Sequence, residues 1–169
     1  MATKLSLNDF EVLGFLGKGA FGQVYLVRRL LTNDRYAMKV VKIYEGLDSK
    51  KIENIANEND IFRKISGEYL VKAAFSFSEG GLHMLFLEYM EGGDLSHLLA
   101  DEVYLDQETA KFYLAEIVLA IEHLHKLNII HRDLKPQNLV LNSAGHLKLT
   151  DFGLSKEEVT TKVERSQKS

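Results

Sequence analysis

Three glycines near the start of the chain, Gly17, Gly19 and Gly22, lie in the stretch LGKGAFGQVYLV with the spacing Gly-x-Gly-x-x-Gly. This spacing occurs where a strand turns into a helix beneath a dinucleotide, and where two strands turn back over the phosphates of ATP. A glycine-containing hairpin without a ligand has the same pattern. The spacing therefore limits this region to a tight turn after a strand, and the residues after Gly22 decide which kind.

The stretch after Gly22 is typical of a β-strand. Residues 24–27 are Val, Tyr, Leu and Val, which favour extended backbone, and no helix-start signal follows the third glycine. A dinucleotide-binding turn requires a helix N-terminus at that glycine. The pattern therefore predicts a strand, a glycine turn and a second strand, and it excludes the dinucleotide fold.

The rest of the first half predicts three more strands and one helix. The predicted elements are a strand at residues 36–43, a helix from the N-cap Ser49 to about residue 65, and strands at about residues 70–77 and 82–89. The turns LTNDR and SEGG separate neighbouring strands.

The second half is led by helices. A short helix follows Asp94, and Asp106 is a suitable N-cap for a long helix. The apolar residues expected on one face of the long helix are Tyr113, Ile117, Ala120, Ile121 and Leu124. Two short strands around the turn at residues 142–145 follow. The whole pattern predicts an α+β fold, with a five-stranded antiparallel sheet and one helix in the first half and a mainly helical second half.

Composition excludes several function classes. The net charge is −3, which does not favour nucleic-acid binding, and no apolar stretch is long enough to span a bilayer. The chain has no cysteine, which excludes disulfides and thiolate metal sites. The first residues lack the apolar region of a signal peptide, and Ala2 occupies the position where myristoylation requires glycine. We therefore expect a soluble, intracellular and cytoplasmic protein.

Lys39 and Glu58 form a candidate charged pair. Lys39 lies on a strand face with small or apolar neighbours, where it either reaches out to solvent or contacts an anion. Glu58 falls on the apolar stripe of the predicted helix, between Ile55 and Phe62. A carboxylate there is costly unless it is paired, so the pattern favours contact with Lys39.

Two polar segments follow apolar stretches later in the chain. HRDLKPQN, residues 131–138, lies between LNII and the strand LVL, and TDFG, residues 150–153, follows the strand LKL. Taken alone, the first can be an ordinary turn and the second a chance match. Their order along the chain is what matters: glycine loop, strand lysine, helix glutamate, His-Arg-Asp loop with a later asparagine, then Asp-Phe-Gly.

This ordered set resembles the protein kinases over nearly the whole chain. Lys135, two residues after Asp133, resembles the serine/threonine kinases, and LEYMEGGDLSHLL and RDLKPQNLVL resemble the cyclic-nucleotide-dependent and protein-kinase-C-like (AGC) group. Gln137 departs from the acidic residue that this group usually carries. The resemblance implies a serine/threonine kinase that uses ATP and Mg²⁺ and acts on protein substrates.

The resemblance also implies roles for individual residues. The nucleotide-contacting residues would be Leu16, Gly17, Lys18, Gly19, Ala20, Phe21, Gly22, Gln23, Val24, Ala37, Lys39, Glu88, Met90, Asp94 and Val140. The catalytic residues would be Lys39, Glu58, Asp133 and Lys135, and the Mg²⁺ ligands would be Asn138 and Asp151. Asp133 would accept the proton of the substrate hydroxyl or orient that hydroxyl, and Lys135 would steady the γ-phosphoryl group.

Further residues are implied in regulation and specificity. Leu87 would be the gatekeeper before the hinge, and Phe62, His131 and Phe152 would stack in the regulatory spine. Asp94 would contact the ribose, and in some relatives it also meets a basic residue of the substrate. Arg132 would bind a phosphate carried by one of the hydroxyl residues Thr160, Thr161 and Ser166.

By the same resemblance, residues 1–87 would form the N-lobe, 88–94 the hinge and 95–169 a partial C-lobe. The family continues beyond this point with an Ala-Pro-Glu motif and further helices. We therefore expect Ile117, Ile121 and Leu124 to lose packing partners and to promote association. Two interpretations remain: the front part of a serine/threonine kinase, or a nucleotide-binding and regulatory module without useful catalysis.

Overall fold

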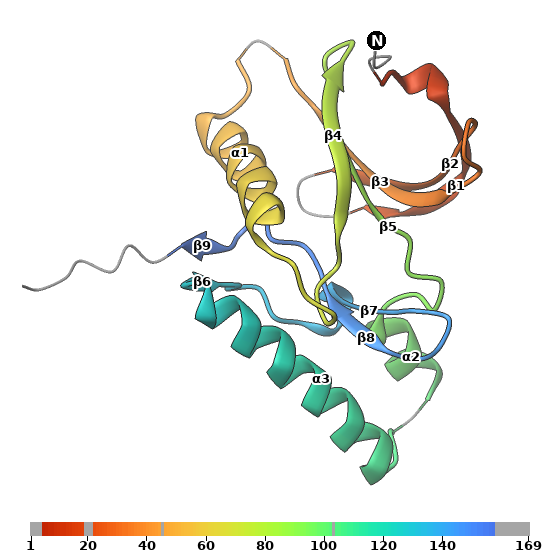
Figure 1. Ribbon diagram of the computed structural model, residues 1–169, viewed down its shortest axis with the longest axis vertical. Helices are drawn as coiled ribbons and strands as arrows, with labels where there is room; N and C mark the ends of the chain where they lie inside the picture. The colour runs from red at the N-terminus through yellow and green to blue at the C-terminus, as the bar shows by residue number, and fades with distance from the viewer. Residues whose placement is uncertain (1–4, 19–21, 45, 103, 158–169) are drawn as a thin grey trace, which may run out of the picture.

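The computed structural model describes residues 5–18, 22–44, 46–102 and 104–157. Its N-terminal part is an antiparallel sheet with the strand order β1-β2-β3-β5-β4, and α1 lies beside this sheet (Figure 1). The elements of this part are η1 (Leu7–Asp9), β1 (Phe10–Lys18), β2 (Gln23–Arg29), β3 (Arg35–Lys42), α1 (Ser49–Lys64), β4 (Ala73–Glu79) and β5 (Leu82–Glu88). The strands on either side of the glycine turn pair antiparallel. This pairing confirms the strand–turn–strand prediction.

The C-terminal part begins after β5 and is led by helices (Figure 1). Its elements are α2 (Leu95–Asp101), α3 (Gln107–Lys126), β6 (Ile129–Ile130), η2 (Pro136–Asn138), β7 (Leu139–Leu141), β8 (Leu147–Leu149) and β9 (Lys156–Glu157). β7 and β8 form the predicted hairpin. β6 also pairs antiparallel with β9, a contact between two-residue strands that no sequence pattern indicated. The α+β class is confirmed.

Among the described residues, two apolar clusters hold the elements together. The first gathers residues from β1, β2, β3 and β5 on one face of the sheet, namely Phe10, Val27, Met38, Met84 and Phe86. The second runs from α1 and β5 through α3 to the β7–β8 hairpin, so it packs the two parts of the chain against each other. Since each large apolar side chain contributes about 1.5–3 kcal/mol when buried, this second cluster fixes the parts that carry the polar motifs.

Helix α1 begins one residue earlier than predicted. Asp48, rather than Ser49, is its N-cap, and the Asp48 carboxylate accepts a hydrogen bond from the backbone nitrogen of Lys50 at 2.9 Å. Both residue types are good caps, so the sequence could not separate them. The predicted apolar stripe also missed Ile61, which is 2% exposed.

Helix α3 has the predicted N-cap and an unpredicted buried carboxylate. Asp106 accepts hydrogen bonds from the backbone nitrogens of Glu108 and Thr109. Glu116 is 4% exposed and accepts a hydrogen bond from the backbone nitrogen of Leu147 at 2.7 Å, while its other oxygen lies 2.7 Å from His146 Nδ1. This carboxylate therefore attaches α3 to the start of β8.

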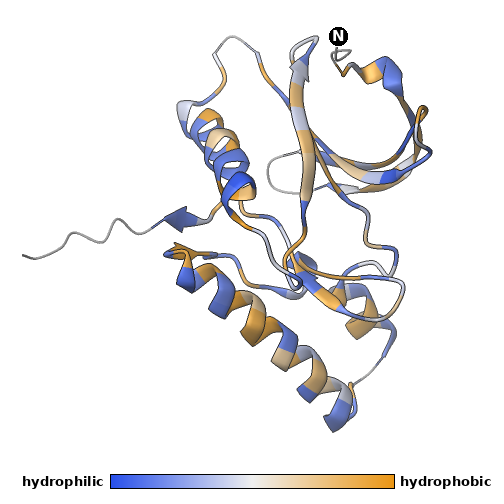
Figure 2. Cartoon of the chain, viewed as in Figure 1, coloured by the Kyte–Doolittle hydropathy of each residue, from blue (hydrophilic) through white to orange (hydrophobic). Residues whose placement is uncertain are grey.

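The apolar face of α3 differs from the expectation. Leu124 is 1% exposed and Ile117 packs against the main cluster, so these residues have partners. The exposed apolar residues of α3 are instead Phe112, Leu114, Val118 and Leu119, at 45%, 59%, 62% and 42%. This helix is apolar along much of its length, so its buried stripe leaves other apolar residues uncovered (Figure 2). In the described ranges, no helix has the length and apolar content needed to cross a bilayer.

Candidate active site

A buried charge cluster joins β3, α1 and the Asp-Phe-Gly motif. Lys39 is 6% exposed, and its Nζ lies 2.7 Å from Glu58 Oε1 and 2.9 Å from Asp151 Oδ1. The sequence predicted the first contact, since a carboxylate on an apolar helix face requires a cation. The second brings a residue 112 positions further along the chain to the same ammonium group.

Burial and charge act in opposite directions on this cluster. Burial alone would lower the pKa of Lys39, but the carboxylates of Glu58 and Asp151 outweigh it, so the pKa of Lys39 is raised. Burial raises the pKa of Glu58, and Lys39 offsets only part of that rise. The ammonium group is thus the feature that allows a carboxylate to be kept at this depth.

A cluster of three rings in edge-to-face contact positions the Asp-Phe-Gly motif. Phe152 is fully buried, with its ring centroid 5.0 Å from that of Phe62 on α1 and 5.3 Å from that of His131. His131 Nε2 lies 2.9 Å from the carbonyl oxygen of Thr150, and burial lowers the pKa of His131. The three predicted rings are therefore in contact, edge to face rather than stacked, and they connect α1 with the loop at residues 131–138.

The loop at residues 131–138 gathers three of the predicted polar residues. Lys135 Nζ donates to Asp133 Oδ2 at 2.6 Å, and Asn138 Nδ2 donates to the same oxygen at 3.0 Å and to the Asp133 carbonyl at 2.8 Å. Burial would raise the pKa of Asp133, but the hydrogen bonds from Lys135 and Asn138 outweigh it and lower the pKa. Asp133 is therefore an ionised carboxylate at neutral pH.

Two residues of these motifs have left-handed backbone. Arg132 has φ 64° and Asp151 has φ 62°, a region that residues other than glycine rarely adopt. Such positions cluster at functional sites, where surrounding contacts hold them. Arg132 Nε donates to the carbonyl oxygen of Leu154 at 2.6 Å. Thr160, Thr161 and Ser166, its predicted phosphate carriers, lie outside the described residues.

The predicted nucleotide-contacting residues line the ends of several strands. Leu16, Gly17 and Lys18 end β1, and Gln23 and Val24 begin β2. Gly19, Ala20 and Phe21 lie outside the described residues. Val24 pairs with Lys39, and Ala37 pairs with the gatekeeper candidate Leu87 on β5. These residues thus occur on paired strands next to the buried charge cluster.

The last residue of β5 and the segment that follows it contact both parts of the chain. The Glu88 carboxylate accepts hydrogen bonds from the backbone nitrogen of Lys72 and from Lys148 Nζ, each at 2.8 Å. Gly92 packs so closely on β7 that an added Cβ would lie 2.8 Å from that of Leu141. Met90 is buried. Neither the Glu88 contacts nor the need for glycine at position 92 was predicted.

Asp94 and Val140 meet where this segment ends. They form an isolated bridge, and Val140 lies on β7 opposite Lys148. Asp94 caps α2, accepting from the backbone nitrogens of Ser96 and His97, and its Oδ2 lies 2.7 Å from His97 Nδ1. Burial would raise the pKa of Asp94, but the hydrogen bonds from Ser96 and His97 outweigh it and lower the pKa.

Gly17 and Gly22 differ in why they are glycines. A Cβ added at Gly22 would lie 2.2 Å from the carbonyl oxygen of Val40, whereas a Cβ at Gly17 would meet nothing within 4 Å. Gly22→Ala should therefore lower the free energy of unfolding by about 1–3 kcal/mol. Gly17→Ala, the matched control, should change it by less than about 0.5 kcal/mol. Urea unfolding without nucleotide measures both, and equal stability of the two variants would contradict the close contact with β3.

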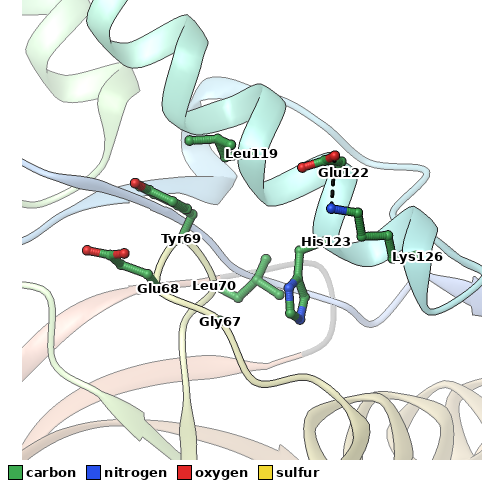
Figure 3. Close-up of a pocket in the computed structure, with 8 residues that line it drawn as sticks. All are labelled: Gly67, Glu68, Tyr69, Leu70, Leu119, Glu122, His123 and Lys126. Carbon is green, nitrogen blue, oxygen red and sulfur yellow. Dashed lines mark ion pairs between the residues drawn. The ribbon is translucent and has the colours of Figure 1, made fainter.

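A separate cavity lies away from these residues. It has a volume of about 210 Å³ and lies between the loop after α1 and the face of α3 (Figure 3). Its lining includes Gly67, Leu70, Leu119 and His123, and a Cβ added at Gly67 would lie 3.5 Å from the His123 ring. None of the residues predicted to bind nucleotide or metal lines it.

The described residues contain no group of three or more His, Cys, Asp or Glu side chains that could hold a metal ion. Asp151 and Asn138 nevertheless carry side-chain oxygens that could bind a metal ion. Their backbones lie close together, because the backbone nitrogen of Thr150, next to Asp151, donates to the Asn138 carbonyl at 2.9 Å. Two such donors suit Mg²⁺ that arrives with phosphate oxygens to complete its shell. The donor set therefore fits a nucleotide-bound Mg²⁺ better than a permanent metal centre.

Comparison of the sequence with known proteins shows the family to which this chain is related. Residues 10–168 match the family model described as protein kinase domain. The chain is 44% identical over 153 residues to a probable serine/threonine protein kinase IRE of Arabidopsis thaliana, covering 90% of this chain and 13% of that protein. It is 45% identical over 159 residues to ribosomal protein S6 kinase alpha-6 of Danio rerio, covering 92% and 21%. Protein kinase 3 of Dictyostelium discoideum is 42% identical over 160 residues, covering 95% and 18%.

The chain belongs to the protein kinase family, and the relatives it matches include proteins named serine/threonine kinases. It spans between 13% and 21% of the length of these three relatives. The resemblance stated from the motifs, including its AGC character, is confirmed by the ribosomal S6 kinases among the relatives.

Proposed function

We propose that this chain provides the ATP-binding and catalytic residues of a serine/threonine kinase, which transfers the γ-phosphate of Mg-ATP to protein hydroxyl groups. The observation that carries the proposal is the buried Lys39 ammonium group between Glu58 and Asp151. A cation held between two carboxylates at this depth is expensive, and such clusters occur where charge must be positioned for chemistry. Phosphoryl transfer requires mainly this positioning of charge.

The proposed roles follow from the contacts. Lys39, oriented by Glu58, would bind the α- and β-phosphates, and Asp151 with the Asn138 side-chain oxygen would hold Mg²⁺, whose chemistry is to neutralise charge on the phosphates. Val24, Ala37 and Val140 would enclose the adenine, with the backbone of Glu88 and Met90 as hydrogen-bonding groups. In this arrangement residues 1–87 act as the N-lobe, 88–94 as the hinge and 95–169 as the beginning of the C-lobe.

Asp133 and Lys135 would act on the transferring group. Because the pKa of Asp133 is lowered, its carboxylate is a weak base and is suited to orient the substrate hydroxyl until the bond to phosphorus forms. Lys135, which already donates to Asp133, would neutralise charge on the γ-phosphoryl group.

The proposal is tested by transfer of labelled γ-phosphate from Mg-ATP to a serine peptide, compared with the same peptide carrying alanine. We expect label only in the serine peptide and only when Mg²⁺ is present. If Mg-ATP raises the melting temperature but no label is transferred, the chain is a nucleotide-binding module. If Mg-ATP neither binds nor reacts, the proposed function is wrong.

The same assay tests a preference for basic residues before the acceptor serine, which we propose for Asp94. This carboxylate keeps a lowered pKa and is partly exposed, so it is an anion that a substrate arginine could contact. Asp94→Asn is the suitable variant because asparagine keeps the N-cap of α2 while removing the charge. The preference for arginine peptides should disappear in Asp94→Asn, and an unchanged preference would contradict this role.

A further inference from the structure

We propose that Asn57 on α1 and Ser155, two residues after the Asp-Phe-Gly motif, are positioning residues that hold Glu58 and Asp151 in register with each other. They thereby set the affinity of the site for the metal-bound phosphates of ATP. This inference rests on the proposed function, because it concerns the same charge cluster.

The first link is a hydrogen bond between α1 and the segment after the motif. Asn57 Nδ2 donates to the carbonyl oxygen of Ser155 at 2.7 Å. Asn57 directly precedes Glu58, so on a rigid helix the place of its amide group fixes the place of the Glu58 carboxylate. Any shift of α1 along its axis would break this bond together with the contact between Glu58 and Lys39.

The second link connects Ser155 to the catalytic loop. Ser155 is 2% exposed, and its Oγ donates to the carbonyl oxygen of His131 at 3.2 Å. Its backbone nitrogen donates to the carbonyl oxygen of Phe152 at 3.0 Å, which closes a turn directly after Asp151. One buried serine therefore connects α1, the turn that carries Phe152 and the loop that carries Asp133.

The neighbouring residues attach the same segment to the same elements. Lys64 in the last turn of α1 forms an ion pair with Glu157, and β6 pairs with β9. Arg132 donates to the carbonyl oxygen of Leu154. Lys64 and Glu157 are about half exposed, so their pair contributes little alone. The Asn57–Ser155 bond is the less exposed part of this attachment, and we expect it to dominate.

A positioning role can be distinguished from simple packing. If Asn57 and Ser155 only stabilise the fold, their loss should weaken every ligand to a similar degree or none. If they position Glu58 against Asp151, their loss should weaken ligands that carry phosphates and Mg²⁺, and it should leave adenosine unaffected. The affinity ratio between Mg-ATP and adenosine is therefore the informative quantity.

The test uses Asn57→Asp, which keeps the shape of the side chain but places an anion, with no donor, against the Ser155 carbonyl. Calorimetric titration should show the dissociation constant of Mg-ATP rising by about 5- to 10-fold, because a hydrogen bond is replaced by repulsion. The dissociation constant of adenosine should stay within about 2-fold of the wild-type value, because adenosine carries no phosphates and does not depend on the positions of Glu58 and Asp151. Ser155→Ala should act in the same direction with a rise of about 2- to 5-fold for Mg-ATP.

Asn59→Ala is the matched control. Asn59 lies on the same helix, but its Nδ2 donates to the Ile55 carbonyl and contacts His83 on β5 instead of the segment after the motif. Asn59→Ala should leave the affinity ratio between Mg-ATP and adenosine unchanged. The inference would be overturned if Asn57→Asp and Ser155→Ala both left the affinity ratio between Mg-ATP and adenosine unchanged, or if they weakened both ligands equally. In either case, binding of Mg-ATP by the wild-type chain would still support the proposed function. A wild-type chain that binds neither ligand would overturn both.

Discussion

Lys39→Met is expected to lower the free energy of unfolding by about 3–5 kcal/mol at neutral pH, because it leaves a buried carboxylate without its cation. Methionine keeps an unbranched side chain only one heavy atom shorter than that of lysine, so most of the loss should arise from charge and not from a cavity. Phosphoryl transfer should fall by about 100-fold or more, as for the loss of other groups that neutralise transition-state charge. Urea unfolding and the peptide assay measure the two effects.

The stability loss should depend on pH with a defined sign. Burial already raises the pKa of Glu58 above its ordinary value of 4.5, and losing Lys39 removes the charge that offsets this rise. The folded state then binds the Glu58 proton more tightly than the unfolded state does, so stability falls as pH rises from about 4.5 through the folded pKa. The difference between Lys39→Met and wild type should be smallest in acid and largest at neutral pH.

The double variant Lys39→Met with Glu58→Gln provides the control. Glutamine removes the carboxylate while keeping its shape, so it should restore much of the stability that Lys39→Met loses at neutral pH. It should also flatten the pH dependence without restoring phosphoryl transfer. A double variant as unstable as Lys39→Met would show that charge burial is not the cause.

Asp133→Asn is expected to reduce phosphoryl transfer by about 10²- to 10⁴-fold, the usual range for loss of an acid–base or proton-accepting group. Asparagine retains an oxygen that can accept the hydrogen bond from Lys135, so the loop should keep its shape. The increase in melting temperature with Mg-ATP should therefore persist, because Asp133 is assigned to the acceptor hydroxyl and not to the nucleotide.

Asp101→Asn is a suitable control for this prediction, since Asp101 is exposed at the end of α2. It should transfer phosphate at the wild-type rate. If Asp133→Asn transferred phosphate as fast as this control, Asp133 would have no role in the chemistry and the assignment of the catalytic loop would be wrong.

Much of the fold could be predicted because buried positions carry apolar residues at spacings that are typical of strands or helices. The alternation around Lys39 indicated β3, and the glycine spacing followed by β-branched and aromatic residues indicated the β1–β2 turn. Glu58 was predictable for a related reason: a carboxylate on an apolar helix face must find a cation, and Lys39 lies on the nearest suitable strand face.

The parts that could not be predicted depend on long-range contacts. The left-handed backbone of Arg132 and Asp151 has no local signal. Arginine rarely adopts this region, and aspartate adopts it more often than most residues but still in a small minority of cases. The contact of Asp151 with Lys39 was not predicted, since the family resemblance implied only a Mg²⁺ role for Asp151, and it became known from the structure. For Leu124, the helical stripe was correct, but the sequence did not indicate that α3 contacts β6 and β8 or that Leu124 joins the main apolar cluster.

The contact of Glu116 with the β7–β8 hairpin has a consequence for how this chain can vary. The carboxylate is bonded to the backbone nitrogen of Leu147, a group that every amino acid except proline carries. Exposed residues at the hairpin tip, such as Ser143 and Ala144, can therefore change without moving β8, which pairs with the strand that presents Val140. Substitutions at the hairpin tip should therefore leave unchanged the surface that would lie beneath the adenine.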